Sequence, residues 1–130
     1  MSHLKGSLHV HTHFSDGAHS PEEMVEVYRN LGYDFVAITD HDYLIKPQYW
    51  ESIPESMGEL IVFKGVELEY PHLRFQHIGK ILGEKETLLI FNHPNQYRLS
   101  AAEVNRQVEV ISRDMTIDCL EVTDKGVYTK

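Results

Sequence analysis

The chain has 130 residues, of which 42% are hydrophobic and 25% are charged, and this composition fits one globular domain rather than a disordered or fibrous chain. The formal net charge of -8 excludes a basic surface that could grip a long duplex through its phosphates, so a nucleic-acid substrate would be bound locally, through metal ions. The single cysteine, Cys119, excludes disulfide bonds within the chain. There is no signal-peptide pattern and no long apolar span, so we expect a cytoplasmic protein that does not enter a membrane.

The first predicted strand covers residues 4–10 and carries two histidines at its end, His9 and His11. Residues two apart on a strand point to the same face, so both imidazoles can converge on one ion. Together with the nearby carboxylate of Asp16 they offer mixed nitrogen and oxygen ligands that suit Zn, Mn or Fe. Two histidines with this spacing bind no metal in about half of the cases, so the interpretation depends on the rest of the chain.

A helix is predicted after this strand, and the segment Ser20-Pro21-Glu22-Glu23 indicates where it begins. Ser20 is the predicted cap, and Glu23, three residues later, closes a capping box. Apolar residues then recur at helical spacing as far as Leu31, and Gly32 supplies the stop.

Four further strands are predicted, at residues 35–39, 60–70, 75–82 and 87–91. The first and the last of these are continuous apolar runs, the pattern of strands buried on both faces. Residues 43–58, between two of them, are predicted to be a loop with one or two short helices. A capping box of Ser100 and Glu103 begins a second helix that runs to Ile111, and a final strand is expected at residues 115–122.

This alternation of strands and helices predicts parallel strands that are covered by helices, the arrangement in which ligands gather beyond the carboxyl ends of the strands. Polar residues of the appropriate kinds do follow the apolar runs. They are His9, His11, Asp40, His41, Glu67 and His93.

Four dispersed motifs occur along the chain. They are His9-Val10-His11 with Ser15-Asp16-Gly17, then Ile38-Thr39-Asp40-His41-Asp42, then Gly65-Val66-Glu67 followed by His77-Ile78-Gly79, and finally Asn92-His93-Pro94. In these motifs the sequence resembles the PHP superfamily (polymerase and histidinol phosphatase) of metal-dependent phosphoesterases. Each motif is weak alone, but the four occur in the family's order over nearly the whole chain.

The resemblance implies an α/β fold, a distorted (β/α)7 TIM-like barrel whose rim holds up to three divalent metals, Zn, Mn or Fe. In the ligand sets that it implies, His9, His11 and Glu67 bind one metal. Glu67, His77 and His93 bind a second, with Glu67 as the bridge, while Asp16 and His41 contribute to a third.

The family's last motif, an Asp-x-His on the final strand, has no match after His93. A barrel of this kind also normally takes roughly 200 or more residues. We therefore expect residues 1–130 to be a single PHP-like domain that is incomplete at its carboxyl end, about the first two-thirds of a full-length one. Strand edges exposed by an open barrel would favour a homo-oligomer.

Three residues near the motifs have less certain roles. Ser15 can bind a substrate phosphate or simply hold its turn. Arg98 can contact a substrate phosphate or lie free on the surface. For Asp40 we expect a contact that orients the imidazole of His41, because metal-bound histidines commonly donate their other N–H to a carboxylate.

The resulting hypothesis is a metal-dependent phosphoesterase that hydrolyses a phosphomonoester or a phosphodiester by metal-activated hydroxide. The expected substrates are a small phosphorylated metabolite, a nucleotide or a short oligonucleotide end, with histidinol phosphate as the alternative. The catalytic set implied by the resemblance is His9, His11, Asp16, His41, Glu67 and His93. A non-catalytic metal-binding or interaction module, inactive because the last motif is missing, is the alternative from another class.

Overall fold

The computed structural model describes residues 2–71, 76–94, 98–124 and 127–128. Its main sheet has the strand order β1-β2-β4-β5-β6-β7, and β3 pairs with the first two residues of β4. The strands are β1 (Gly6–Val10), β2 (Phe35–Ile38), β3 (Ser56–Met57), β4 (Leu60–Glu69), β5 (His77–Leu82), β6 (Thr87–Phe91) and β7 (Cys119–Leu120). The helices are α1 (Pro21–Asn30), α2 (Tyr49–Ser52) and α3 (Ala101–Ile111), and a small hairpin of β8 (Thr123–Asp124) and β9 (Val127–Tyr128) follows β7.

The sheet is mixed rather than wholly parallel. The pairs β1–β2, β2–β4 and β6–β7 are parallel, as expected, but β5 is antiparallel to both β4 and β6. The prediction of parallel strands is therefore wrong for β5, because the connections on either side of it are too short for a helical crossover. The turn into β6 is closed by a hydrogen bond of 2.9 Å from Gly83 N to Glu86 O. As a result, the start of β5 lies beside the carboxyl ends of β4 and β6.

Both long helices begin where the sequence predicts. The Ser20 side chain accepts a hydrogen bond from Glu23 N, and the Glu23 side chain accepts one from Ser20 N. Ser100 and Glu103 form the same reciprocal capping box at α3. After α1 the chain turns through Gly32, whose φ of 72° lies in the left-handed region that glycine adopts at little cost.

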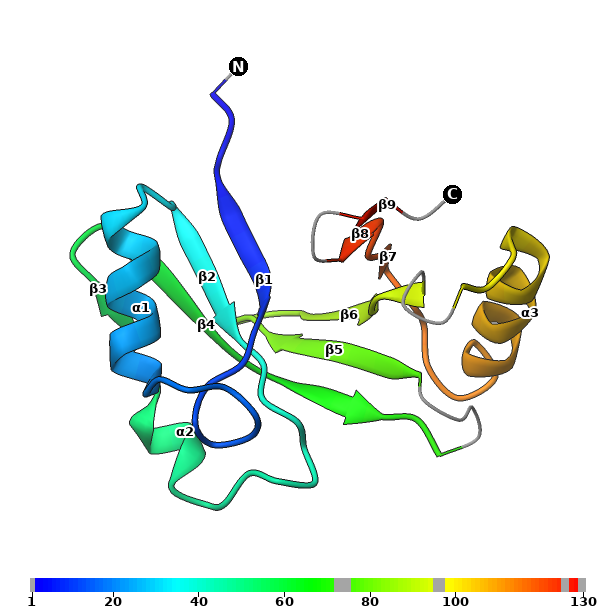
Figure 1. Cartoon of the computed structure of the whole chain (residues 1–130), viewed down its shortest axis with the longest axis horizontal. Helices are drawn as coiled ribbons and strands as arrows, with labels where there is room; N and C mark the ends of the chain where they lie inside the picture. The colour runs from blue at the N-terminus through cyan, green and yellow to red at the C-terminus, as the bar shows by residue number, and fades with distance from the viewer. Residues whose placement is uncertain (1, 72–75, 95–97, 125–126, 129–130) are drawn as a thin grey trace.

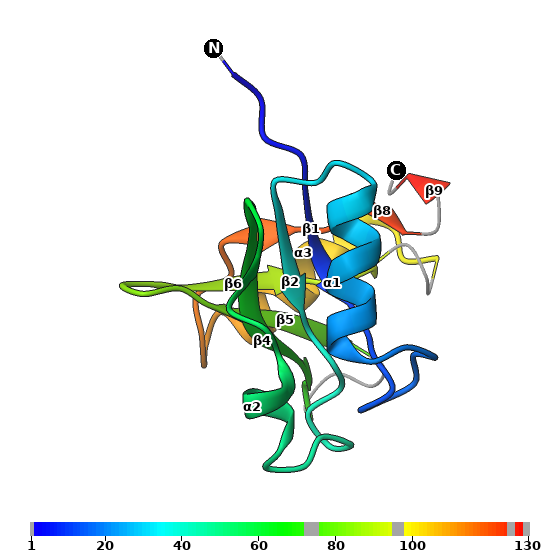
Figure 2. The same cartoon turned by 90° about the vertical axis from the view of Figure 1, so that its left-hand side faces the viewer.

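Three clusters of buried apolar residues pack against the sheet, and one of them, Ala37 with Ile81 and Ile90, is formed by strand residues alone. The helices cover the other two (Figure 1). One joins α1 and α2 to β1, β2 and β4, and its buried residues include Val25, Val36 and Tyr49. The other joins α3 to β5 and β6 through Ile78, Phe91 and Ile111. Figure 2 shows the sheet from the side of α1.

The sheet curls so strongly that β1 approaches β5, although two strands separate them in the strand order. The fold is thus the expected α/β architecture, a mixed sheet curled into part of a TIM-like barrel. Within the described residues β1 and β7, the two outer strands, do not pair.

Three predicted elements differ from the observed ones. The expected last strand, residues 115–122, is reduced to Cys119–Leu120, because Met115 and Ile117 pack against the α3 layer instead of joining the sheet. The first strand begins at Gly6, and residues 43–58 contain only the single turn α2 and the short strand β3. The predicted start of the 75–82 strand lies outside the described residues. Among the helices described, none is long and apolar enough to cross a membrane.

Candidate metal centre

One rim of the curled sheet collects the predicted ligands. His9 lies at the end of β1, Glu67 near the end of β4 and His77 at the start of β5. The other four, His11, Asp16, His41 and His93, lie in the segments that follow β1, β2 and β6. All seven predicted metal ligands therefore come together, and the reversed direction of β5 explains how a residue at the start of a strand joins residues at the ends of others.

Glu67 is the centre of this cluster. Its side chain is fully buried, and five imidazoles surround its carboxylate. Oε1 lies 2.9 Å from His93 Nε2, 3.2 Å from His9 Nε2 and 3.4 Å from His77 Nδ1. Oε2 lies 2.9 Å from His11 Nε2 and 3.2 Å from His41 Nδ1. Each oxygen thus faces its own group of imidazoles.

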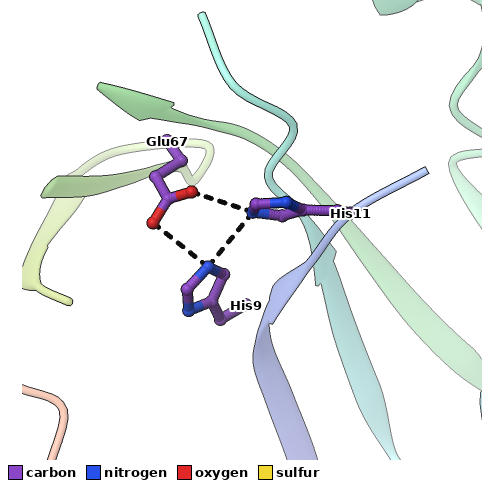
Figure 3. A group of neighbouring side chains, drawn as sticks. All are labelled: His9, His11 and Glu67. Atoms are coloured by element: carbon purple, nitrogen blue, oxygen red, sulfur yellow. Dashed lines mark hydrogen bonds and ion pairs between the residues drawn. The ribbon is translucent and has the colours of Figure 1, made fainter. Parts of the chain in front are cut away.

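Figure 3 shows how the side chains of His9, in β1, and His11, just after it, point to the same side and meet the carboxylate of Glu67. The two Nε2 atoms are 3.1 Å apart. Asp16 extends the cluster toward solvent, with Oδ1 2.6 Å from His11 Nδ1 and Oδ2 3.6 Å from His41 Nε2.

The charges of this cluster are strongly coupled. Burial raises the pKa of Glu67, but hydrogen bonds from the surrounding histidines outweigh that effect and hold the pKa far below its usual range. Burial lowers the pKa of His9, but the hydrogen bonds and charges of Glu121 and Glu67 outweigh this effect and raise the pKa to about 10. The pKa of His41 is lowered, chiefly by burial. Without a metal, the carboxylates therefore hold protons on some imidazoles of the centre.

The donor set fits divalent cations. Three groups have ligand atoms that all lie within 4.8 Å of one another: His9 with His11 and Glu67, His11 with Asp16 and His41, and His41 with Glu67 and His77. In the described part of the chain, His41 Nδ1, His77 Nδ1 and Glu67 Oε2 are buried without a well-formed hydrogen bond. Nitrogen and oxygen atoms that converge at close range without good hydrogen-bond geometry are suitable ligands for a cation.

These groups differ in detail from the ligand sets that the resemblance implies. The structure groups His77 with His41 and Glu67, while His93 Nε2 lies 2.9 Å from Oε1 of the same carboxylate. Which imidazoles share which ion stays a prediction.

Asp40 does not orient His41, contrary to our expectation. Its buried carboxylate accepts hydrogen bonds from Thr12 N and Thr12 Oγ1, both at 2.7 Å, and from Ser15 Oγ at 2.5 Å. Adjacent side chains at the end of a strand point in different directions, so Asp40 turns toward the segment after β1 while His41 turns into the centre. Ser15 therefore forms the hydrogen bond that holds its turn, which is one of the two roles considered for it.

Arg98 is exposed, and its φ of 54° is left-handed. A contact with substrate phosphate stays a prediction for this residue.

Sequence reasoning missed two polar residues at the centre. Asn92 Nδ2 donates a hydrogen bond to Glu67 Oε1 at 3.0 Å. The Asn92 amide lies against Gly79, where an added Cβ would come within 3.1 Å of the amide oxygen. Glu121 follows β7 and contacts His9. Its position after Cys119-Leu120, a polar residue behind an apolar pair, was a signal that could have identified it.

A match of the sequence to a protein-family model agrees with the order and geometry of these ligands. The family model of the PHP domain matches residues 7–121. The chain belongs to the PHP domain family.

Similar proteins are longer than this PHP domain. The DNA polymerase/3'-5' exonuclease PolX of Bacillus subtilis is 28% identical over 134 residues, which cover 86% of this chain and 24% of PolX. Ribonuclease P protein component 3 of Methanosarcina barkeri is 30% identical over 99 residues, which cover 75% of this chain and 40% of that protein. The crystal structure of a proposed metal-dependent phosphoesterase from Bifidobacterium adolescentis has a TM-score of 0.50 at 27% identity and covers 88% of this chain and 41% of that one. The chain thus spans less than half the length of each.

Proposed function

We propose that this PHP domain hydrolyses phosphate esters with divalent metals held by the rim cluster. The observation that carries the proposal is the carboxylate of Glu67, whose two oxygens face separate groups of imidazoles. A carboxylate in this position can hold two cations at once, because each oxygen is a ligand. The similarity to PolX and to the proposed phosphoesterase supports the same reaction class.

The proposed ligand sets are those that the family resemblance implies. His9 and His11 would hold one ion with Glu67, and His77 and His93, which both face Oε1, would hold another with the same carboxylate. Asp16 and His41 would contribute to a third ion at the exposed side of the cluster. Bound divalent metals lower the pKa of water and neutralise phosphoryl oxygens. The residues of this chain fix the positions of the ligands, and Asn92 orients the bridging carboxylate by its hydrogen bond to Oε1.

For the substrate we propose a nucleotide or the end of a short oligonucleotide. The support is that both curated relatives carry names of nucleic-acid enzymes or their components. The net charge of -8 makes recognition through metal-bound phosphate more favourable than recognition along a duplex. Histidinol phosphate and other small phosphometabolites are the alternative substrates. We further propose that residues 1–130 act as one domain, and that the unpaired edges of the curled sheet favour a homo-oligomer.

The test measures metals per chain by elemental analysis after loading with Mn²⁺, Zn²⁺ or Fe²⁺, followed by hydrolysis of p-nitrophenyl phosphate, bis-p-nitrophenyl phosphate, nucleotides and 5'-phosphorylated oligonucleotides. We expect at least two metals per chain and turnover that a chelator abolishes. His9→Asn should remove both properties. His13→Asn is the matched control, since the exposed His13 contacts the His19 carbonyl and lies outside the cluster.

The second candidate is a metal-binding module without activity, which would use the same ligand groups of the rim. Metal binding without turnover of any of these substrates would support it and would contradict the hydrolase proposal.

A further inference from the structure

Glu121 connects two ligand-bearing segments of the rim. It lies directly after β7, where its backbone N–H donates to Phe91 O at 3.0 Å. Its Oε1 lies 3.2 Å from His9 Nδ1, and its Oε2 accepts a hydrogen bond of 2.6 Å from His93 N. One carboxylate therefore contacts a side chain at the end of β1 and the backbone that follows β6.

The contact with His9 determines which ring nitrogen is available to a metal. His9 Nε2 faces the centre, 3.2 Å from Glu67 Oε1, whereas Nδ1 faces Glu121. Both ring nitrogens of His9 face a carboxylate in the metal-free chain, but once Nε2 binds a metal the single proton of a neutral His9 lies on Nδ1, where Glu121 accepts it. Glu121 therefore favours the tautomer whose Nε2 lone pair coordinates a metal.

The contact with His93 stabilises an unusual backbone conformation. His93 has a φ of 29°, a positive value that residues other than glycine seldom adopt. The hydrogen bond from its N–H to Glu121 supports this conformation, in which His93 Nε2 lies 2.9 Å from Glu67 Oε1.

Glu121 also spans a gap. A cavity of about 380 Å³ separates β1 from β6 and β7, and its lining includes His9, Asn92 and Glu121. The side chain of Glu121 reaches across this space to His9, at a place where no described ladder joins β1 to β7.

We propose that Glu121 is a positioning residue that fixes the tautomer of His9 and the backbone of His93, and thereby places both imidazoles for metal binding. This inference rests on the metal binding of the proposed function. Glu121 contacts His9 at Nδ1 and His93 at its backbone N–H, and we do not assign it as a metal ligand.

The test replaces Glu121 by Gln, which has the same shape. The amide oxygen can still accept the His93 N–H, but the amide nitrogen donates and would force the His9 proton onto Nε2. Asp118→Asn is the matched control, because Asp118, just before β7, also accepts a backbone hydrogen bond, from Leu89 N at 2.9 Å.

We expect Glu121→Gln to bind Zn²⁺ about 10- to 100-fold more weakly than wild type in competition with a chelator, the usual cost of losing a group that supports a metal ligand. Asp118→Asn should bind like wild type. In the zinc-loaded wild type, imidazole ¹H–¹⁵N spectra should show the His9 proton on Nδ1. The metal-free Glu121→Gln chain should still fold and unfold in one cooperative urea transition, as Asp118→Asn does.

Equal zinc affinity of wild type and Glu121→Gln, or a His9 proton on Nε2 in the wild type, would overturn the role of Glu121 alone. A Glu121→Gln chain that does not fold would also overturn it, in favour of a structural role. If the wild type binds no metal, the proposed function fails and this inference fails with it.

Discussion

Two buried carboxylates lie side by side on this rim, and they have opposite surroundings. Asp40 follows β2 and Glu67 lies near the end of β4, and a backbone hydrogen bond of 2.9 Å joins Glu67 N to Asp40 O. Both side chains are fully buried. Asp40 accepts hydrogen bonds from an amide and two hydroxyl groups, whereas Glu67 is surrounded by imidazoles.

The difference shows that burial alone does not identify a functional carboxylate. A buried charge must be compensated in either case. Amide and hydroxyl donors compensate Asp40 permanently and hold the turn after β1. Imidazoles can release their protons and turn their lone pairs to a cation, so the surroundings of Glu67 can exchange protons for metal.

Replacing the carboxylate of Glu67 should have the largest effect. Glu67→Gln removes the negative charge and one of the two ligand oxygens, so metal binding and turnover should be lost. With metal at 100 times its Kd, wild type should gain about 2.7 kcal/mol of unfolding free energy, and the variant should gain none. Urea titrations with and without Zn²⁺ measure both values, and a variant stabilised like wild type would contradict the bridging role.

A pH series tests whether the partners of Glu67 exchange protons. The pKa of His9 is raised to about 10 in the fold, so its proton stabilises the metal-free chain fully below pH 6.5. That contribution should decline as the pH rises from 6.5 to about 10, while the apparent zinc affinity increases over the same range.

The measurement is urea unfolding of the chelator-treated chain at several pH values, with His9→Asn for comparison. His41 acts in the opposite sense, because its pKa is lowered. The difference between wild type and His9→Asn isolates His9, and parallel stability curves for the two proteins would contradict the prediction.

Asp40→Asn should weaken the fold but leave metal binding largely intact. The amide cannot accept all three hydrogen bonds from Thr12 and Ser15, and leaving a buried donor unsatisfied costs about 1–3 kcal/mol. Asp42→Asn is the control, since within the described residues its buried Oδ1 receives no hydrogen bond. Both variants should still be stabilised by Zn²⁺, and loss of metal binding in Asp40→Asn would remove the contrast with Glu67.

An exposed carboxylate should have the smallest effect of the set. Glu23 caps α1, and the hydrogen bonds from Ser20 lower its pKa. Its contribution should be present above pH 4.5 and be lost as the pH falls through the lowered pKa. Glu23→Gln should shift the urea midpoint at pH 7 less than Asp40→Asn does, and a larger shift would mean that α1 depends on its cap more than on packing.

Local features of the sequence predicted the local structure well. Ser20 and Glu23 are three residues apart, so their capping box depends on no distant contact. The ligand residues could be named from their motifs because each follows a strand or begins one. Their assembly around a single carboxylate could be expected only from the family resemblance.

Features that depend on strand direction and on side-chain direction were harder to predict. The short interval between β5 and β6 indicates a hairpin, whereas the alternation of strands and helices along the chain indicates parallel strands. Asp40 adjoins His41 in sequence, but neighbouring side chains diverge, so proximity in sequence does not make them partners. Glu121 belongs to none of the four motifs, and its contacts with His9 and His93 span 112 and 28 residues of sequence.

From the reversed strand β5 we also expect a particular order of assembly of the centre during folding. It makes β4, β5 and β6 a meander with short connections, so Glu67, His77 and His93 come together through contacts that are close in sequence. Such contacts form with a small loss of loop entropy and therefore early. β1 must then close a far longer loop to bring His9 and His11 to a half of the centre that is already in place.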